Sequence, residues 1–165
     1  MSKHDLTAEQ LRERFSYDPD TGVFTQRLRT TSRVKVGEPL GSLTHNGYVE
    51  VWVHGSKYMA HRLAWLYVYG KWPEAHLDHI NRVRTDNRIG NLREASKVQN
   101  GQNTKLNRRN TSGVKGVCWC SQYQKWKAYI CLNRSVRALG RFTDINDAIA
   151  ARKAAEALLH PFATT

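Results

Sequence analysis

Apolar and polar residues alternate over short stretches in the first third of the chain, which predicts a short helix followed by small strands. A helix is expected to begin within residues 6–11, because Thr7 and Gln10 have the spacing of a capping box and flanking leucines can form a hydrophobic staple. Residues 17–22 have the composition of a turn, and residues 23–28 read as a strand after it. The opening segment is therefore predicted to form a small sheet.

Stronger patterns cover the middle of the chain. Residues 48–53 alternate and place three valines on one face, and residues 54–56 predict a hairpin turn into a second strand. Residues 60–69 carry apolar side chains at helical spacing and are followed by Gly70, which favours a helix that ends at this glycine. We expect this helix to pack beside the segment that follows it.

The C-terminal part combines polar and apolar stretches. Residues 96–103 predict a helix with Ser96 as a candidate N-cap, and residues 105–111 are basic and poor in apolar residues, which is typical of a linker. Apolar and aromatic stretches follow, and then an alanine-rich helix that Asp144 can cap. The residues expected to line the apolar side of this last helix are Ile145, Ala148, Ile149, Ala155, Leu158 and Leu159.

Charge adds a functional constraint to this mixed pattern. The chain has 165 residues, with 26 Lys and Arg against 14 Asp and Glu, a formal charge of +12 and a pI near 10.0. Its length suits two or three small modules better than one large domain. The charge favours polyanions through counterion release, although a ribosomal or membrane-surface protein would have a similar composition.

Targeting and cysteine patterns narrow the setting. No apolar run approaches the roughly 20 residues that cross a bilayer, and the first residues contain no apolar signal region, so a cytoplasmic location is expected. The odd number of cysteines, Cys118, Cys120 and Cys131, makes a disulfide scaffold and a structural zinc site poor interpretations. We expect three reduced thiols in a small sheet, and the absence of coiled-coil heptads favours a monomer or a weak dimer.

One constellation of residues carries chemistry. Asp78 and His79 are adjacent, Asn91 lies 12 residues after His79, and Asn100 lies 21 residues after it. On an extended segment, neighbouring side chains leave opposite faces, so the carboxylate can hold a cation while the imidazole faces a water. Histidine titrates near pH 6.5 and suits a general base, whereas Mg²⁺ prefers oxygen ligands. The set therefore indicates phosphodiester hydrolysis.

This spacing resembles that of the HNH nuclease superfamily, in particular the homing endonucleases of phages and introns. The resemblance implies a core of two strands and a helix around one metal ion, Mg²⁺ or Mn²⁺, held by Asp78 and Asn100. It also implies that His79 is the general base, that Asn91 braces the loop between the strands, and that the products carry 5′-phosphate and 3′-hydroxyl ends. A phage or a phage-derived element is the setting that it implies.

Residues near this constellation have other predicted roles. The segment 59–64 resembles the stretch before the metal motif in phage HNH proteins, where His61 is interpreted as a structural histidine and Arg62 as a phosphate contact. His76 matches no signature position and is not taken as a ligand. Residues 81–88 form a turn-rich loop without the Asp-Gly turn common in the family.

The tail carries a second resemblance. Residues 112–119, 125–130 and 139–142, followed by the alanine-rich helix, are similar to the AP2 DNA-binding domain. That domain is a three-stranded antiparallel sheet on one helix, and its sheet lies in the major groove of double-stranded DNA. Trp126 is interpreted as either a reader or a core residue. The candidate DNA contacts of the whole chain are Arg62, Arg82, Arg84, Arg93, Lys105, Arg108, Arg109, Lys115, Trp119, Lys125, Lys127, Arg134 and Arg137.

The sequence therefore predicts an α+β protein with a ββα-metal nuclease core between two other modules. The expected divisions are a strand-rich accessory region at residues 1–57, the nuclease core at 58–104, a basic linker at 105–111 and an AP2-like domain at 112–165. The predicted function is site-directed, metal-dependent cleavage of double-stranded DNA. The alternatives are a non-cleaving DNA-binding regulator with a relic nuclease core and a structural RNA-binding protein.

Overall fold

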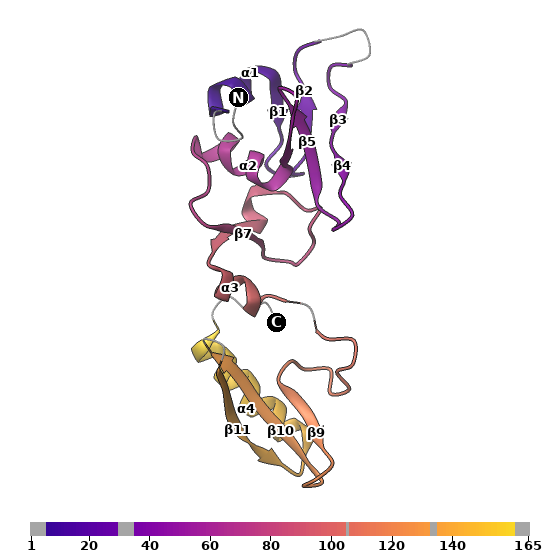
Figure 1. Ribbon diagram of the computed structural model, residues 1–165, viewed down its shortest axis with the longest axis vertical. Coiled ribbons are helices and arrows are strands. Elements are labelled where there is room, and N and C mark those ends of the chain that lie inside the picture. The colour runs from indigo at the N-terminus through magenta and orange to yellow at the C-terminus, as the bar shows by residue number, and fades with distance from the viewer. Residues whose placement is uncertain (1–5, 30–34, 105, 133–134, 161–165) are drawn as a thin grey trace. The chain divides into compact units, whose positions relative to one another are not determined.

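Small sheets and helices alternate along the chain in the computed structural model, which describes residues 6–29, 35–104, 106–132 and 135–160 (Figure 1). They form two compact units, Met1–Ser96 and Lys97–Thr165. The mixed α/β architecture expected from the sequence is present in these small sheets and helices. The boundary between the units at residue 96 differs from the predicted boundaries at residues 57, 104 and 111.

The described residues of the first unit form three small antiparallel sheets and two main helices. Its elements in chain order are α1 (Ala8–Arg14), β1 (Phe15–Tyr17), β2 (Phe24–Gln26), β3 (Pro39–Leu40), β4 (Ser42–Leu43), β5 (Val49–Val53), β6 (Ser56–Met59), α2 (Ala60–Tyr69), β7 (His76–His79), the 3-10 helix η1 (Ile89–Asn91) and β8 (Leu92–Ala95). The sheets have the strand orders β1-β2-β3, β4-β5-β6 and β7-β8.

Local sequence signals explain where the two helices begin and end. Thr7 accepts a hydrogen bond from the Gln10 backbone N–H, and Gln10 returns one to Thr7, so the predicted capping box of α1 is confirmed. Helix α2 covers the predicted residues and ends at Gly70, whose φ of +74° lies in the left-handed region that glycine adopts without strain. The predicted strand at residues 23–28 is shorter, because only Phe24–Gln26 pairs with a neighbour.

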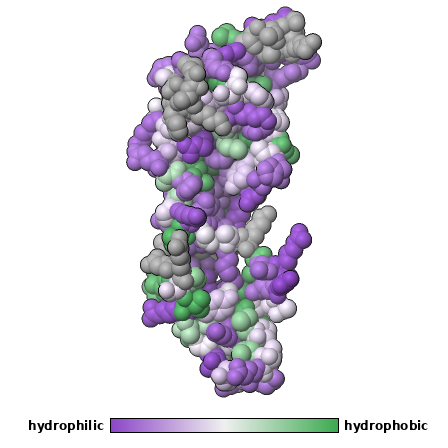
Figure 2. Space-filling view, in the orientation of Figure 1, coloured by the Kyte–Doolittle hydropathy of each residue, from purple (hydrophilic) through white to green (hydrophobic). Residues whose placement is uncertain are grey.

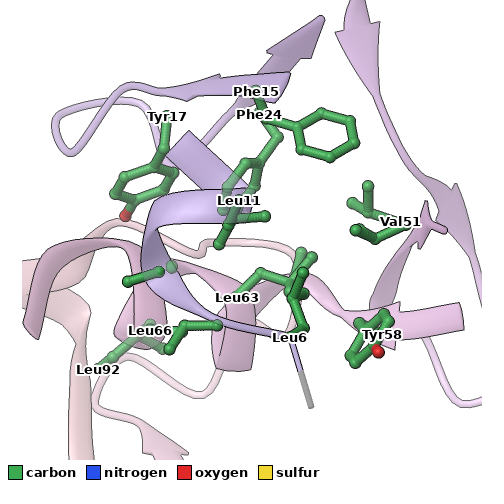
Figure 3. Close-up of a cluster of buried hydrophobic side chains, with 14 residues drawn as sticks. Leu6, Leu11, Phe15, Tyr17, Phe24, Val51, Tyr58, Leu63, Leu66 and Leu92 are labelled. Carbon is green, nitrogen blue, oxygen red and sulfur yellow. The ribbon is translucent and has the colours of Figure 1, made fainter. Parts of the chain in front are cut away.

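One hydrophobic core joins the elements of the first unit (Figure 3). Helix α1 contributes Leu11, α2 contributes Leu63 and Leu66, β5 contributes Val51, and Leu92 enters from β8. Burial of such side chains contributes roughly 1.5–3 kcal/mol each. The predicted accessory region and the predicted nuclease segment therefore contribute side chains to the same hydrophobic core.

The second unit is a three-stranded antiparallel sheet with helices. Its elements are α3 (Lys97–Gln102), β9 (Val117–Cys120), β10 (Lys125–Leu132), β11 (Ser135–Phe142) and α4 (Ile145–Leu159), and the strand order is β11-β10-β9. Helix α4 lies along this sheet in Figure 1, and Ala148 packs on Val117 and Ala128. The AP2-like character of this segment stays a prediction. Asp144 caps α4 by accepting from the Asn146 N–H.

Two residues of α4 differ from the predicted apolar side. Leu158 is 82% exposed, because it lies about 80° around the helix from Ala148, which faces the sheet. Arg152 is 2% exposed, and its position one turn after Ala148 directs a charged side chain inward. Hydrophobicity alone therefore mispredicted which residues of this helix are buried.

The face of the molecule shown in Figure 2 is mainly polar. Hydrophilic residues cover most of the face seen in Figure 2, with small apolar patches between them. Among the described residues, no helix combines the length and the apolar character that a membrane crossing requires. The three cysteines are free thiols on β9 and β10.

Candidate active site

The β7-β8 hairpin positions the predicted catalytic pair. Asp78 pairs with Arg93 and His79 pairs with Leu92 across the two strands. Asp78 is 6% exposed and His79 is 5% exposed, which is unusual for polar side chains without a specific environment. As neighbours on a strand they leave opposite faces, so the carboxylate and the imidazole have separate surroundings.

An asparagine holds the His79 ring. Asn87 Oδ1 lies 3.3 Å from His79 Nε2, and Asn87 is 2% exposed. The Asn87 amide nitrogen donates to the Thr85 carbonyl at 3.3 Å, which leaves the amide oxygen for the imidazole. His79 Nε2 is therefore the protonated nitrogen of the neutral ring, and Nδ1 is the nitrogen with a lone pair for a proton.

Burial and hydrogen bonding act on the His79 pKa in opposite directions. Burial lowers the pKa below its ordinary value of 6.5, while the hydrogen bond to Asn87 and the charge of Asp78 partly offset this. The net shift is downward, so the imidazole is neutral near pH 7. A neutral, oriented imidazole can accept a proton from a water.

Two further rings surround His79. The His61 ring lies 5.2 Å away, edge to face, and the Tyr48 ring lies 5.9 Å away. Burial lowers the pKa of His61 to about 3, so this ring is also neutral. Its Nδ1 has no hydrogen-bond partner among the described residues, so the structural histidine inferred from the sequence is buried but not fully satisfied.

Arg93 pairs with the predicted metal ligand. Its Nε and Nη2 donate to Asp78 Oδ2 at 3.0 and 2.9 Å, so Asp78 has a counter-charge within its own hairpin. The predicted role of Arg93 in contacting DNA stays a prediction. A carboxylate is an oxygen donor of the kind that Mg²⁺ and Mn²⁺ prefer, so the donor chemistry of Asp78 fits such an ion.

The rest of the predicted ligand set is not assembled in the first unit. Among the residues that the structure describes, no group of three or more His, Cys, Asp or Glu side chains could hold a metal ion. Asn100, the second predicted ligand, lies on α3 in the second unit. Its pairing with Asp78 remains a prediction.

Asn91 braces the loop between β7 and β8. Its Oδ1 accepts from the Asn81 backbone N–H at 3.0 Å, and its Nδ2 donates to Asn81 Oδ1 at 3.0 Å and to the Asp86 carbonyl at 2.8 Å. These bonds connect both ends of the loop to η1. These contacts agree with the loop-bracing role that the resemblance implies for Asn91. A catalytic role of Asn91 stays a prediction.

The same loop has further internal contacts. Arg88 donates to both carboxylate oxygens of Asp86, which lowers the pKa of this carboxyl to about 2. Arg82 has a φ of +63°, in the left-handed region that residues other than glycine seldom adopt. The Tyr17 hydroxyl donates to the Asn87 carbonyl at 2.7 Å and connects the loop to β1.

A close backbone approach allows the turn at residues 18–22 to pack on this loop. Gly22 has a φ of +74°, and a Cβ at this position would lie 2.5 Å from the Arg88 nitrogen and 2.5 Å from the Asn87 carbonyl carbon. Only glycine fits this approach. The N-terminal turn therefore supports the segment that holds the imidazole.

Predicted phosphate contacts of the first unit lie in different environments. Arg84 is exposed, stacks over Tyr48 at 4.9 Å and donates to the Asn46 carbonyl at 2.7 Å. Because Tyr48 adjoins His79, Arg84 lies at the edge of the catalytic pair. Arg62 is half-buried against Trp72, and Arg82 is half-buried in the loop. Their parts in DNA binding stay predictions.

The sheet of the second unit has two faces. Val117 and Ala128 form a cross-strand pair that packs on α4. The pair of Trp119 and Trp126 lies two residues further along both strands, so it is on this same α4 face, with the two rings 5.3 Å apart. Trp126 packs on the core, as one of the two interpretations had it. Arg137 pairs with the buried Ile130 and has the same orientation.

The opposite face, here called the free face, carries other basic residues. Lys125 and Lys127 alternate with the α4-facing residues of β10, and Lys127 pairs with Arg141. Arg141 stacks over the Tyr123 ring at 4.0 Å. The predicted DNA contacts Trp119 and Arg137 therefore lie on the opposite face of the sheet from Lys125 and Lys127. The roles of all four residues in DNA binding stay predictions.

The remaining basic residues are partly fixed or exposed. Lys115 Nζ donates to the Gln102 carbonyl, the Thr104 carbonyl and Thr104 Oγ1 at 3.1, 2.6 and 3.0 Å. Arg108 and Arg109 are exposed. Two predicted contacts, Lys105 and Arg134, lie outside the described residues.

Sequence reasoning missed three residues of the site: Asn87, Tyr48 and Tyr17. Asn87 lies in a polar, turn-rich stretch where asparagine normally satisfies local geometry, so its burial left no local signal. Tyr48 and Tyr17 reach the site from other elements. Their contacts depend on tertiary packing, which no pattern in the sequence specifies.

Comparison with known proteins finds a nuclease family over the segment that contains these residues. Residues 58–102 match a family model described as HNH endonuclease, a range that includes Asp78, His79, Asn91 and Asn100. A protein of Escherichia phage T7, "Protein 3.8", is 31% identical over 71 residues, which cover 42% of this chain and 59% of the phage protein. The chain thus spans about three fifths of that relative's length.

The comparisons indicate a nuclease domain and leave the C-terminal part open. No solved structure matches the chain. The match to the HNH family ends at residue 102, so the resemblance of residues 112–165 to the AP2 domain stays a prediction. The fold of the second unit is described by its own sheet and helix.

Proposed function

We propose that this protein is a metal-dependent DNA endonuclease in which His79 is the general base. The observation that carries the proposal is the buried His79 ring, fixed by Asn87 at 3.3 Å and adjacent to Asp78, inside the segment that matches the HNH endonuclease family. A relic core under no constraint would have no need of a buried, oriented and neutral imidazole. The proposed substrate is double-stranded DNA.

The protein's own groups supply the proton transfer. His79 Nδ1 accepts a proton from a water, whose oxygen then forms a bond to phosphorus while the bond from phosphorus to the 3′ oxygen breaks. The departing oxygen takes a proton from solvent, so the products carry 5′-phosphate and 3′-hydroxyl ends. Asn87 keeps Nε2 as the donor nitrogen and thereby keeps Nδ1 available throughout the step.

Asp78 and Asn100 would hold one Mg²⁺ or Mn²⁺ ion. When bound, such an ion supplies charge neutralisation at the phosphate and at the leaving oxygen. With Arg93 paired to Asp78 at 2.9 Å, the carboxylate has a counter-charge in the absence of the cation. Arg93 can transfer to a DNA phosphate once a cation takes over that charge, which would couple metal binding to substrate binding.

DNA binding is proposed to involve both units. Arg84 adjoins the catalytic pair, and the free face of the second unit carries Lys125 and Lys127 beside Arg141. The formal charge of +12 supplies the non-specific component of affinity. We propose that the second unit is an AP2-like module that directs cleavage to chosen sites, as in homing endonucleases. The protein would act as a monomer or weak dimer in the cytoplasm of a phage-infected cell.

Cleavage of supercoiled plasmid tests the proposal. The intact protein should nick or linearise the plasmid with Mg²⁺ or Mn²⁺ and should be inactive with chelator, and His79→Ala should remove cutting at equal DNA occupancy. If both proteins bind DNA and neither cuts in any metal, the regulator with a relic nuclease core replaces the endonuclease. If the intact protein cuts with a divalent metal and stops cutting when chelator is added, cleavage requires the metal.

A further inference from the structure

A cavity lies within the second unit, and neither Asp78 nor His79 is among its lining residues. Its volume is about 640 Å³, within the range of small-molecule sites, and its walls come from α3, the end of β10 and the end of α4. Ile130, Leu132 and Leu159 supply apolar walls, whereas Gln102, Lys115 and Arg152 supply polar ones. Nothing in the proposed nuclease chemistry uses this cavity.

Arg152 is the unusual residue of the cavity. Its side chain is 2% exposed, yet its Nε and Nη1 have no hydrogen-bond partner among the described residues. Nη1 lies 3.3 Å from Glu156 Oε2, which is a charge contact without hydrogen-bond geometry. A buried guanidinium with unmatched N–H groups destabilises the fold, because those groups have lost their hydrogen bonds to water. Burial of this kind is expected where a ligand completes the bonding.

A glycine makes room for the guanidinium. Gly116 also lines the cavity, and a Cβ at this position would lie 2.6 Å from Arg152 Nε and 2.3 Å from the Tyr129 carbonyl oxygen. Its φ of +77° is a second reason for glycine at this position. The bare backbone lets the Arg152 side chain pass between β10 and the turn before β9 and reach the cavity wall.

The surroundings of Arg152 favour an anion. Lys97 and Lys115 line the same cavity, and no acidic residue is among its described lining residues. Lys115 Nζ is bonded to Gln102 and Thr104, so it is a fixed positive charge that holds the rim in place. Gln102 Oε1 is buried without a hydrogen-bond partner in the described chain, and it can accept from a hydroxyl or N–H of a ligand.

We propose that this cavity binds a phosphate monoester, with the Arg152 guanidinium as its anchor. A guanidinium presents Nε and a terminal nitrogen side by side, which matches two oxygens of a phosphate. The volume exceeds that of a phosphate group, and the apolar walls with Gln102 can receive the organic part of the ester. The phosphate belongs either to a free small molecule or to the end of a nucleic-acid strand.

NMR of the full-length protein tests the proposal directly. Inorganic phosphate is titrated at constant ionic strength while the arginine Nε–H signals are followed, with Arg152 assigned by triple-resonance spectra. The Arg152 signal should shift saturably and the melting temperature should rise by several degrees. Arg152→Met should abolish both effects, and Lys153→Met, which changes an exposed charge on the same helix, should retain them.

Other results would overturn the proposal. The absence of a saturable shift in the intact protein would do so even if Arg152→Met failed to fold, and so would equal phosphate binding by a folded Arg152→Met. Two further probes identify the source of the phosphate. A shift with thymidine 5′-monophosphate but not with a 5′-phosphorylated duplex supports a free ester. A shift with the 5′-phosphorylated duplex but not with the same duplex lacking the phosphate supports a strand end. The absence of a shift with every probe contradicts the site. Because no cleavage is measured, these outcomes are independent of the nuclease proposal.

Discussion

Replacing Asn87 tests how the imidazole is held. Asn87→Leu keeps the approximate shape of the side chain but removes the acceptor 3.3 Å from His79 Nε2 and the donor to Thr85. A buried donor left without its partner costs about 1–3 kcal/mol. If this energy is what keeps His79 in its reactive orientation and tautomer, its loss should lower the cleavage rate roughly 5- to 150-fold.

Asn87→Asp separates orientation from charge. A carboxylate still accepts from His79 Nε2, so the rate above neutral pH should remain within a few-fold of the intact protein. Its negative charge raises the pKa of His79, whereas burial lowers that pKa in the intact protein. A general base must be unprotonated, so the intact enzyme should lose activity only below about pH 6.5 and the variant should begin to lose it at higher pH.

The assay is single-turnover plasmid cleavage between pH 5 and pH 9, with DNA binding and circular dichroism measured for each variant. Asn46→Leu, at an exposed asparagine of the same unit, is the matched control and should cut at the normal rate. The reasoning is refuted if folded Asn87→Leu cuts normally, or if Asn87→Asp at pH 8 loses as much activity as Asn87→Leu.

Three further predictions concern stability and metal binding. Arg93→Met removes the guanidinium partner of Asp78 and should destabilise the protein by about 2 kcal/mol, which is less than the loss of a fully buried pair because Arg93 is partly exposed. In thermal melts, Mg²⁺ should then stabilise the variant more than the intact protein. Equal stabilisation of the two proteins would contradict this prediction. His61 has a pKa of about 3 in the folded protein and 6.5 in the unfolded chain, so between these values it binds a proton mainly when unfolded. Its contribution to the free energy of unfolding is therefore complete above pH 6.5 and falls by about 1.4 kcal/mol per pH unit from pH 6 to pH 4. In urea unfolding, His61→Phe should show a weaker dependence of this free energy on pH, and an unchanged dependence would contradict the prediction. Tyr17→Phe removes the 2.7 Å bond to the Asn87 carbonyl and should cost about 1–2 kcal/mol in urea unfolding, whereas a neutral effect would show that this bond does not hold the loop.

Local signals explain which parts of the fold the sequence predicts well. The capping box of Thr7 and Gln10 involves residues three positions apart, and Gly70 ends α2 by its own backbone conformation, so both are visible in the sequence. Tertiary packing decides the rest. Leu92 joins the core of α1 and α2, which unites segments that charge and composition had separated. Arg152 is buried although a hydrophobic pattern would expose it.

The candidate site divides in the same way. The spacing of Asp78, His79 and Asn91 predicts the hairpin residues, and the structure places them on β7 and η1. The acceptor for His79 comes from a loop whose shape depends on Arg82, a non-glycine residue with a left-handed backbone, and on a contact from Tyr17, 70 residues before Asn87. Contacts at this sequence separation form only when the whole unit folds, so the sequence could not indicate them.

Single-turnover cleavage by His79→Ala is the most direct test of the central claim. His76→Ala, on the same strand but exposed, is the matched control, and protein is added in excess so that all DNA is bound. With Mg²⁺ the account predicts that His79→Ala binds DNA normally and loses cutting by at least about 100-fold, as expected for a general base, whereas His76→Ala cuts normally. Normal cutting by His79→Ala would contradict the account.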